Sequence, residues 1–197
     1  MVNLASLNKV AIAKAAMICQ DIQLDEQALK RLDTNLPPVD FLKALIEQEL
    51  YPDAVRFLAR ALPKREAVWW ACLCARSVLA DDAVRPAQIK AIEIAEQWVY
   101  KPTEANRRLA DAAARAAEFT GPAGWAAMAA FWSEGSMAPE NLPVVPPAEN
   151  LTAKAVAGAV MLAAVLTQPE KSQDKYRFFL EQGIDIANGG NGRLWQG

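Results

Sequence analysis

The stretch from Arg65 to Arg76, which reads REAVWWACLCAR, constrains the fold of this chain more than any other. If this stretch is helical, its interior is apolar on every side, and such a helix must be enclosed by protein or by lipid. Its length of 12 residues makes ~18 Å of helix, which is too short to cross the ~30 Å of hydrocarbon in a bilayer. The stretch therefore predicts a helix at the centre of a protein core, with Trp69 and Trp70 both enclosed.

Apolar residues recur at spacings of three and four along most of the chain, and this periodicity predicts about nine helices and no strand. One expected helix follows Asn8 and runs over 10–19, because the asparagine oxygen can cap the first turn. Another is expected to follow Thr103 and to end at Phe119. A length of 197 residues suits one domain. We therefore expect a single all-α domain over 1–197, folded as an irregular multi-helix bundle or a stack of helical hairpins.

Two segments lack helical periodicity. Residues 133–150 contain four prolines at positions 139, 143, 146 and 147, and proline removes the backbone donor that a helix or strand needs. We name this segment the connector and expect it to pack on the helical body, because it holds several apolar residues and little charge. Residues 189–197 begin with Gly189 and Gly190 and are expected to form a flexible tail.

The composition excludes several classes of site. The chain has no histidine, which removes Ser-His-Asp and Cys-His catalysis and every histidine-containing metal site. A net charge of -2 without a basic run gives no reason to expect nucleic acid as a partner. The uncharged run 155–166 is shorter than the ~20 residues of a transmembrane helix. We expect no membrane span.

The three cysteines indicate a reducing compartment. Cys72 and Cys74 lie two residues apart, so a helix separates their side chains by ~200°, and no histidine or second cysteine pair completes a metal site. A structural disulfide is not expected, and the first 20 residues lack the apolar run of a secretory signal. These features favour the cytoplasm, with no metal, no cofactor and no catalytic residue predicted.

The charged residues around the central stretch are interpreted as structural ion pairs. Arg76 lies on a helix that is expected to be buried, and an unpaired buried charge is costly. Glu66 is too far along the axis to reach it, whereas Glu93 or Glu96 on the following long helix is a suitable partner. A ligand-binding arginine is the alternative reading of Arg76.

Five residues are candidates for binding a partner. Phe131 and Trp132 stand at a helix end and are followed by Ser133 and Ser136, which is a combination of aromatic and small polar residues found in recognition pockets. The alternative is that the two aromatic rings fill the core. Trp195 lies in the Gly-rich tail and either docks on its own domain or is offered to another chain.

Four motifs spread along the chain form a set, at positions 65–72, 98–107, 130–136 and 143–147. Together they resemble an uncharacterised bacterial family, a domain of unknown function whose members are often encoded near type VI secretion components. The resemblance covers roughly residues 60–190, and Glu134 departs from it because a small residue is expected there. It implies, by association, an accessory protein that handles a secretion effector or spike component.

The sequence therefore leaves three functions open. The first is a non-enzymatic adaptor or chaperone-like factor of type VI secretion, which binds its partner through the connector or the tail. The second is an enzyme that uses carboxylates, for instance Glu66 or Glu93 together with an arginine. The third is an immunity protein that binds a cognate toxin.

Overall fold

The computed structural model describes residues 4, 6–79 and 85–194, and these residues fold into ten α-helices and one short 3-10 helix, with no strand among them. The all-α prediction is confirmed. The helices in chain order are α1 (Ala15–Cys19), α2 (Glu26–Leu29), α3 (Pro38–Glu47), α4 (Tyr51–Ala61), α5 (Lys64–Leu79), α6 (Pro86–Tyr100), α7 (Glu104–Ala116), α8 (Pro122–Phe131), α9 (Leu151–Leu166), the 3-10 helix η1 (Pro169–Lys171) and α10 (Ser172–Ala187).

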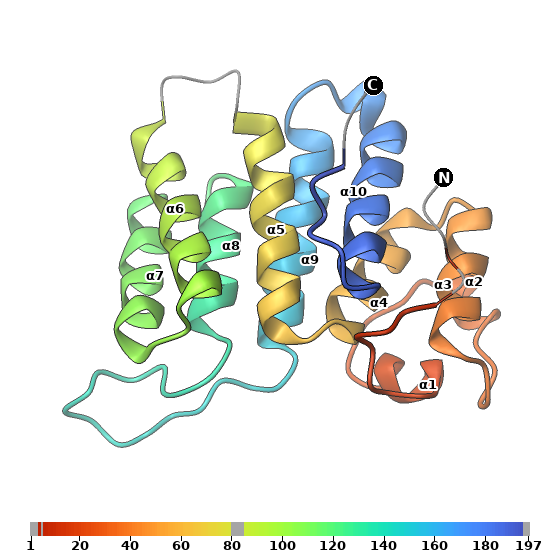
Figure 1. The fold of residues 1–197 in the computed structure, drawn as a ribbon, viewed down its shortest axis with the longest axis horizontal. Helices are drawn as coiled ribbons and strands as arrows, with labels where there is room; N and C mark the ends of the chain where they lie inside the picture. Colours follow the sequence, from red (N-terminus) through yellow and green to blue (C-terminus); the bar gives the residue numbers. More distant parts are fainter. Residues whose placement is uncertain (1–3, 5, 80–84, 195–197) are drawn as a thin grey trace.

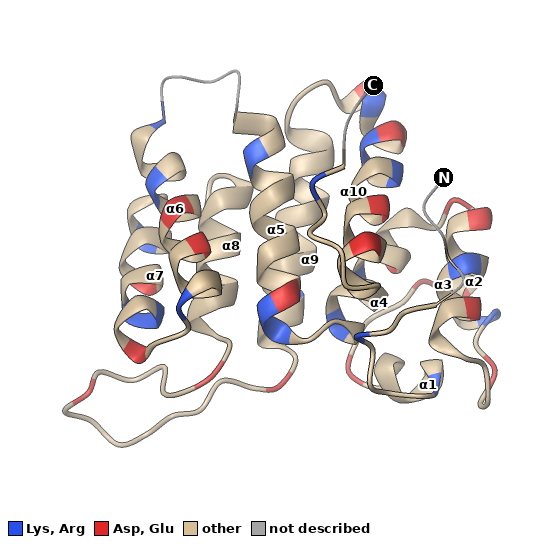
Figure 2. Cartoon of the chain, in the orientation of Figure 1, with Lys and Arg blue, Asp and Glu red and all other residues tan. Residues whose placement is uncertain are grey.

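The long helices stand side by side, with α5 and α9 in the middle of the molecule (Figure 1). On one side α6 and α8 pack against this central pair, with α7 outside them against α6 and α8, and on the other side α4 and α10 pack. The near absence of charged residues explains why α8 and α9 are surrounded by other helices. Figure 2 shows them almost without charged residues, since α8 carries none and α9 only Lys154. Helices that are apolar on all sides are stable only when other helices surround them.

Proline and threonine set several helix starts. Pro38, Pro52, Pro86 and Pro122 each lie at the first or second position of a helix, where the missing amide donor has no partner to lose. Thr103 caps α7, because its side chain accepts a hydrogen bond from the Asn106 amide. The helix ends at Ala116, three residues before the predicted end, since Glu118 and Phe119 adopt positive φ angles of 55° and 54°.

The first predicted helix is wrong over its first half. Only Ala15–Cys19 is helical, and residues 10–14 have no regular structure. The Lys9 amide donates to the Ala187 carbonyl at the end of α10, and the Ala15 amide donates to the Leu36 carbonyl ahead of α3. The backbone donors of this segment therefore hold it against distant parts of the chain instead of forming a helical ladder.

Trp70 is the centre of the packed core. It is fully buried, and its indole nitrogen donates to the Phe179 carbonyl of α10 at 2.7 Å. Gly183 makes room for this ring, because a Cβ there would lie 2.7 Å from Leu58 and 2.9 Å from Trp70. The prediction of an enclosed central helix holds for this side of α5.

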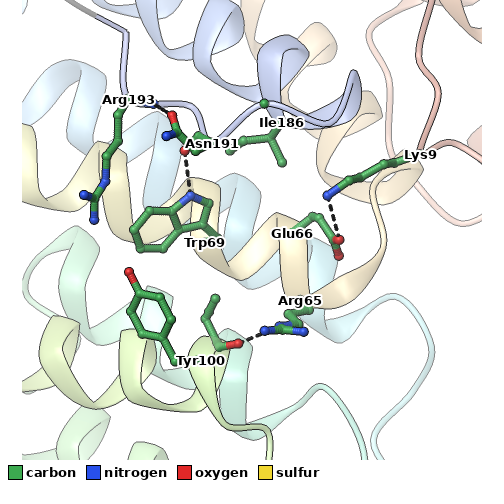
Figure 3. Close-up of a pocket in the computed structure, with 10 residues that line it drawn as sticks. Lys9, Arg65, Glu66, Trp69, Tyr100, Ile186, Asn191 and Arg193 are labelled. Carbon is green, nitrogen blue, oxygen red and sulfur yellow. Dashed lines mark hydrogen bonds and ion pairs between the residues drawn. The ribbon is translucent and has the colours of Figure 1, made fainter.

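Trp69, by contrast, is only partly buried, so the prediction that both tryptophans are enclosed is wrong for this residue. Its side chain lies on the side of α5 that faces the segment 189–194, next to Asn191 (Figure 3). The Trp69 indole donates to the Asn191 carbonyl at 2.8 Å. On the same side, a Cβ at Gly192 would lie 2.7 Å from Leu73, so the chain passes very close to α5.

The segment 189–194 is docked on the helices and is not the flexible tail that the sequence predicts. The Gln182 side chain donates to the Gly192 carbonyl, and the Gly192 amide donates to a carboxylate oxygen of Asp185. Both side chains belong to α10. Asp185 therefore holds the glycine-rich segment in one conformation. Trp195 lies outside the described residues.

Among the described residues, no single helix has the length and hydropathy needed to cross a bilayer, in agreement with the expected absence of a membrane span. The segments Leu151–Leu166 and Pro169–Ala187 pass that test only as a pair, with a bend of 118° between them.

Candidate functional site

A cleft of about 460 Å³ opens beside Trp69, where α5, α6 and the end of the chain meet (Figure 3). We name it the Trp69 cleft. Its volume falls in the range of ~300–1,000 Å³ that is typical of ligand pockets. Most of its charged and aromatic lining comes from three places: the first turns of α5, the end of α6 and the segment 189–194. These lining residues are Lys9, Arg65, Glu66, Trp69, Tyr100 and Arg193.

Helical geometry brings Arg65 and Trp69 to the same wall of the cleft, because residues four apart lie on one face of a helix. Tyr100 ends α6 and faces them across the cleft, with its ring centroid 6.0 Å from that of Trp69. Arg193 comes from the docked end of the chain and lies over the Trp69 ring at 5.3 Å. Tyr100 and Arg193 thus both lie against the Trp69 ring.

The cleft is positively charged, although the whole chain carries a net charge of -2. It is lined by three cations and by the carboxylate of Glu66. The Lys9 ammonium donates to Glu66 at 3.1 Å, so these two charges neutralise each other. Arg65 uses its Nε to donate to the Val99 carbonyl at 2.5 Å. Among the described residues, neither Arg65 nor Arg193 has a carboxylate within ion-pairing distance.

The residues predicted to form structural ion pairs separate into three groups. Arg76 donates to both carboxylate oxygens of Glu96, at 2.5 and 2.7 Å, and these hydrogen bonds raise the Arg76 pKa. Arg76 is nevertheless exposed, contrary to the expectation of a buried charge. Glu93 pairs with the neighbouring Lys90 on the surface. Glu66 lines the Trp69 cleft, away from Arg76.

The predicted contact residues at the end of α8 are used mainly inside the protein. Phe131 and Ser133 are buried, so as contact residues they are wrong, and the reading that the aromatic ring fills the core is correct for Phe131. Trp132 is partly buried, and its carbonyl accepts a hydrogen bond from Thr152. The Ser136 hydroxyl accepts from the Ala138 and Val145 amides.

A fully buried arginine organises this region. Arg107 donates from Nε and Nη2 to Glu104, from Nη1 to the Phe131 carbonyl at 2.7 Å and from Nη2 to the Ser136 carbonyl at 2.9 Å. Arg108 adds bonds to Glu104 and to the Ala138 carbonyl. We name this arrangement the Arg107 clamp. Hydrogen bonds from the Arg107 guanidinium lower the Glu104 pKa to about 2, and Arg108 adds to the effect.

The clamp holds the start of the connector, while the middle of the connector projects from the helical body (Figure 1). The outgoing and returning parts of the connector are joined by a hydrogen bond from the Met137 amide to the Val145 carbonyl. At the tip, which we define as residues 139–146, Leu142, Val144 and Val145 are 54%, 75% and 47% exposed. The expected packing on the body is therefore wrong for the tip.

The start of α5 connects the cleft to the connector. The Lys64 ammonium donates to the Ser133 carbonyl at 2.9 Å and pairs with Glu149 at 3.4 Å. One side chain thus contacts both ends of the connector. The next residue, Arg65, lines the Trp69 cleft. The two candidate surfaces therefore adjoin each other at the first turn of α5.

The described residues offer no group of three or more carboxylates and thiols that is suited to hold a metal ion. Cys19, Cys72 and Cys74 are free and buried. Burial raises the pKa of Cys19 to about 11 and also raises the pKa of Cys72 and Cys74. Because the thiolate is the reactive form, all three behave as small apolar residues of the core.

The sequence reasoning missed the two arginines that matter most. Arg107 received no role from the sequence, although it is fully buried and paired with Glu104. Arg193 was assigned to a flexible tail. One signal was available for it: a helix that is apolar on every side needs cover from another segment, and residues 189–194 supply part of that cover.

Comparison with known proteins gives one match. The model of a family of unknown function (DUF6931) matches residues 41–187, which run from within α3 to the end of α10. No curated protein and no solved structure matches the chain.

Proposed function

The chain belongs to DUF6931, a family of unknown function, and from that premise we propose that it is a non-enzymatic accessory protein that binds another protein through the tip of its connector. The single observation that carries this proposal is the exposure of Leu142, Val144 and Val145 on a projecting loop. Neighbouring exposed apolar side chains mark interaction sites more often than a free surface.

The base of the connector makes this loop suitable for binding. A loop that is already ordered loses little conformational entropy when a partner covers it. Three features supply this order: the Arg107 clamp, the contacts of Lys64 with both ends, and the hydrogen bond between the outgoing and returning parts of the connector. The prolines restrict the backbone further. A partner with an apolar groove fits a tip of this kind.

The partner's identity follows from the resemblance described above and not from geometry. That resemblance supports a component of type VI secretion, such as an effector or a spike protein, and hence an adaptor or chaperone-like role. The three free thiols support a reducing compartment, which suits the cytoplasm.

The enzyme alternative has less support. Of the two carboxylates suggested for it, Glu66 lines the Trp69 cleft, whereas Glu93 pairs with Lys90 on the surface. Glu66 lies in the cleft with two arginines, but its carboxylate is already paired with Lys9. A carboxylate that works as a general acid or base must be free to reach the substrate.

The test is affinity purification of the full chain from its native cell, followed by calorimetry of the recovered partner with purified variants. We expect Leu142→Ser combined with Val144→Ser to weaken binding by about tenfold or more. The matched control is Leu29→Ser combined with Val165→Ser, two apolar residues exposed elsewhere at 51% and 43%. Both double variants should keep the wild-type melting temperature.

Three outcomes would count against the proposal. Recovery of no protein would refute it. Equal binding of the tip variant and the control would refute the tip as the contact. A partner unrelated to type VI secretion would leave protein binding in place and refute only the assignment to that apparatus.

A further inference from the structure

We infer that the Trp69 cleft binds a carboxylate of the partner protein and that its aromatic wall receives the apolar group next to that carboxylate. The identity of the ligand rests on the proposed function, because the carboxylate is taken to belong to a protein. The site itself rests on the geometry of the cleft and is tested separately.

Charge is the first argument. Elsewhere in the described structure, arginines close to acidic residues pair with them, as Arg76 does with Glu96 and Arg115 with Asp111. Arg65 and Arg193 line the same cleft, and neither has a carboxylate partner within residues 4, 6–79 and 85–194. Two guanidinium groups beside one cavity attract an anion, and a ligand that enters the cavity loses part of the water that would screen the attraction.

The second argument is the geometry of Arg65. Its Nε donates to the Val99 carbonyl, and this bond restrains the plane of the guanidinium at the edge of the cleft. The two terminal nitrogens remain for a ligand, and a planar guanidinium matches the two oxygens of a carboxylate. The Lys9–Glu66 pair borders the same side of the cleft, so a ligand there meets Arg65 as the unpaired cation (Figure 3).

The third argument is the aromatic wall. Tyr100 is 65% exposed although it stands next to Trp69, and Ile186 lines the same cleft. Tryptophan, tyrosine and arginine are the residue types enriched at the energetic centres of protein interfaces. A carboxylate with an apolar group beside it uses both the charge and the rings, whereas free phosphate uses only the charge. A protein supplies such a carboxylate either at its C-terminus or on an acidic side chain.

The position of the cleft agrees with this assignment. Lys64, which holds both ends of the connector, directly precedes Arg65. A partner that covers the connector tip can therefore extend along the start of α5 to the cleft. We expect one partner to occupy both surfaces.

The experiment follows the indole N–H signal of Trp69 by NMR, which the variant Trp69→Phe identifies among those of the six tryptophans. N-acetylphenylalanine represents a C-terminal carboxylate, and N-acetylglutamate α-amide represents an acidic side chain. We expect a saturable shift with at least one of them, and the one that binds more tightly identifies the source. N-acetylphenylalanine amide, which lacks the charge, should give no saturable shift.

Arg65→Gln and Arg193→Gln should each weaken probe binding by about fivefold or more, because each removes a charge-assisted contact. Arg115→Gln is the matched control, since Arg115 is an exposed arginine far from the cleft lining and should leave binding unchanged. Raising the salt concentration from ~0.05 M to ~0.5 M should also weaken binding. Unchanged signals from the other tryptophans would show that the variants are folded.

Several results would overturn the assignment. These are the absence of a saturable shift with both carboxylate probes, an equal response to the amide or to inorganic phosphate, and wild-type binding by both arginine variants. The connector-tip variant Leu142→Ser/Val144→Ser should bind N-acetylphenylalanine normally. Failure of the cleft and failure of the connector tip are therefore separate results.

Discussion

The Arg107 clamp and the Trp69 cleft each place an arginine over an aromatic ring, but the two arginines differ in their hydrogen-bond partners. In the clamp, Arg107 lies 4.7 Å above the Phe131 ring and has all three nitrogens bonded to Glu104 or to backbone carbonyls. In the cleft, Arg193 lies 5.3 Å above the Trp69 ring and has no carboxylate partner among the described residues. Within the part of the chain that the structure describes, the Arg107 ion pair is complete and Arg193 is left without one.

This difference teaches how to separate structure from recognition in a chain of unknown function. A buried arginine whose donors are all satisfied stabilises the fold, and a ligand has nothing left to contact. An exposed arginine beside aromatic rings has donors to spare. The presence of an arginine beside an aromatic ring is therefore not informative by itself. The number of guanidinium N–H donors that have no partner is the informative quantity.

The largest expected effect is a difference in stability between variants of the two adjacent tryptophans. Trp70→Ala should lower the free energy of unfolding by about 4 kcal/mol, because it leaves a large cavity in the core. Trp69→Ala should cost about 2 kcal/mol or less, because this ring is partly exposed. Chemical denaturation followed by circular dichroism measures both. Equal losses would contradict the division of α5 into a closed and an open side.

A smaller difference in stability is expected between variants of Arg107 and Arg65. Arg107→Met should lower the free energy of unfolding by about 3 kcal/mol, because the buried carbonyls of Phe131 and Ser136 lose their donor. Arg65→Met removes one hydrogen bond at a more exposed position and should cost about 1 kcal/mol or less. The same denaturation assay applies. If Arg65→Met proved the more damaging change, the cleft arginine would have to be counted as structural.

The smallest effect is a pH dependence confined to the clamp. The Glu104 pKa is lowered from 4.5 to about 2 in the folded chain, so its stabilising contribution is present above pH ~4.5 and is lost as the pH falls toward ~2. Glu104→Gln removes this contribution, and the wild type should therefore exceed the variant in unfolding free energy at pH ~6 but not near pH ~2. Because the carboxylate is half exposed, the gap should stay below about 1 kcal/mol. A gap independent of pH would contradict the ion pair.

Much of the fold can be predicted from the sequence because the helical signals are local. The prolines in the first turns of α4 and α6 and the threonine that caps α7 act within a few residues. The segment 10–14 escapes prediction for the opposite reason. Its neighbouring amides bond to Leu36 and Ala187, which are distant in sequence, and periodicity carries no information about such partners.

The candidate site is harder to predict than the fold. The stretch around Trp69 was identified as central, but its open side depends on how far residues 189–194 cover α5. A glycine-rich segment has no periodicity from which docking can be predicted, and here it is held by the side chains of Trp69, Gln182 and Asp185, which are distant or carry no local signal. Phe131 and Ser133 are wrong as contact residues because both are buried, and burial cannot be read from residue type alone.

The contacts of Lys64 have a consequence for how this protein can change. Because one ammonium group holds Ser133 and Glu149 together, the stretch between them begins and ends at almost the same point of the body. Residues at the outer end of that stretch can be replaced, lengthened or shortened without moving a helix. Under the proposal that the tip binds a partner, a change of partner needs changes in this one loop alone and leaves the helical scaffold constant.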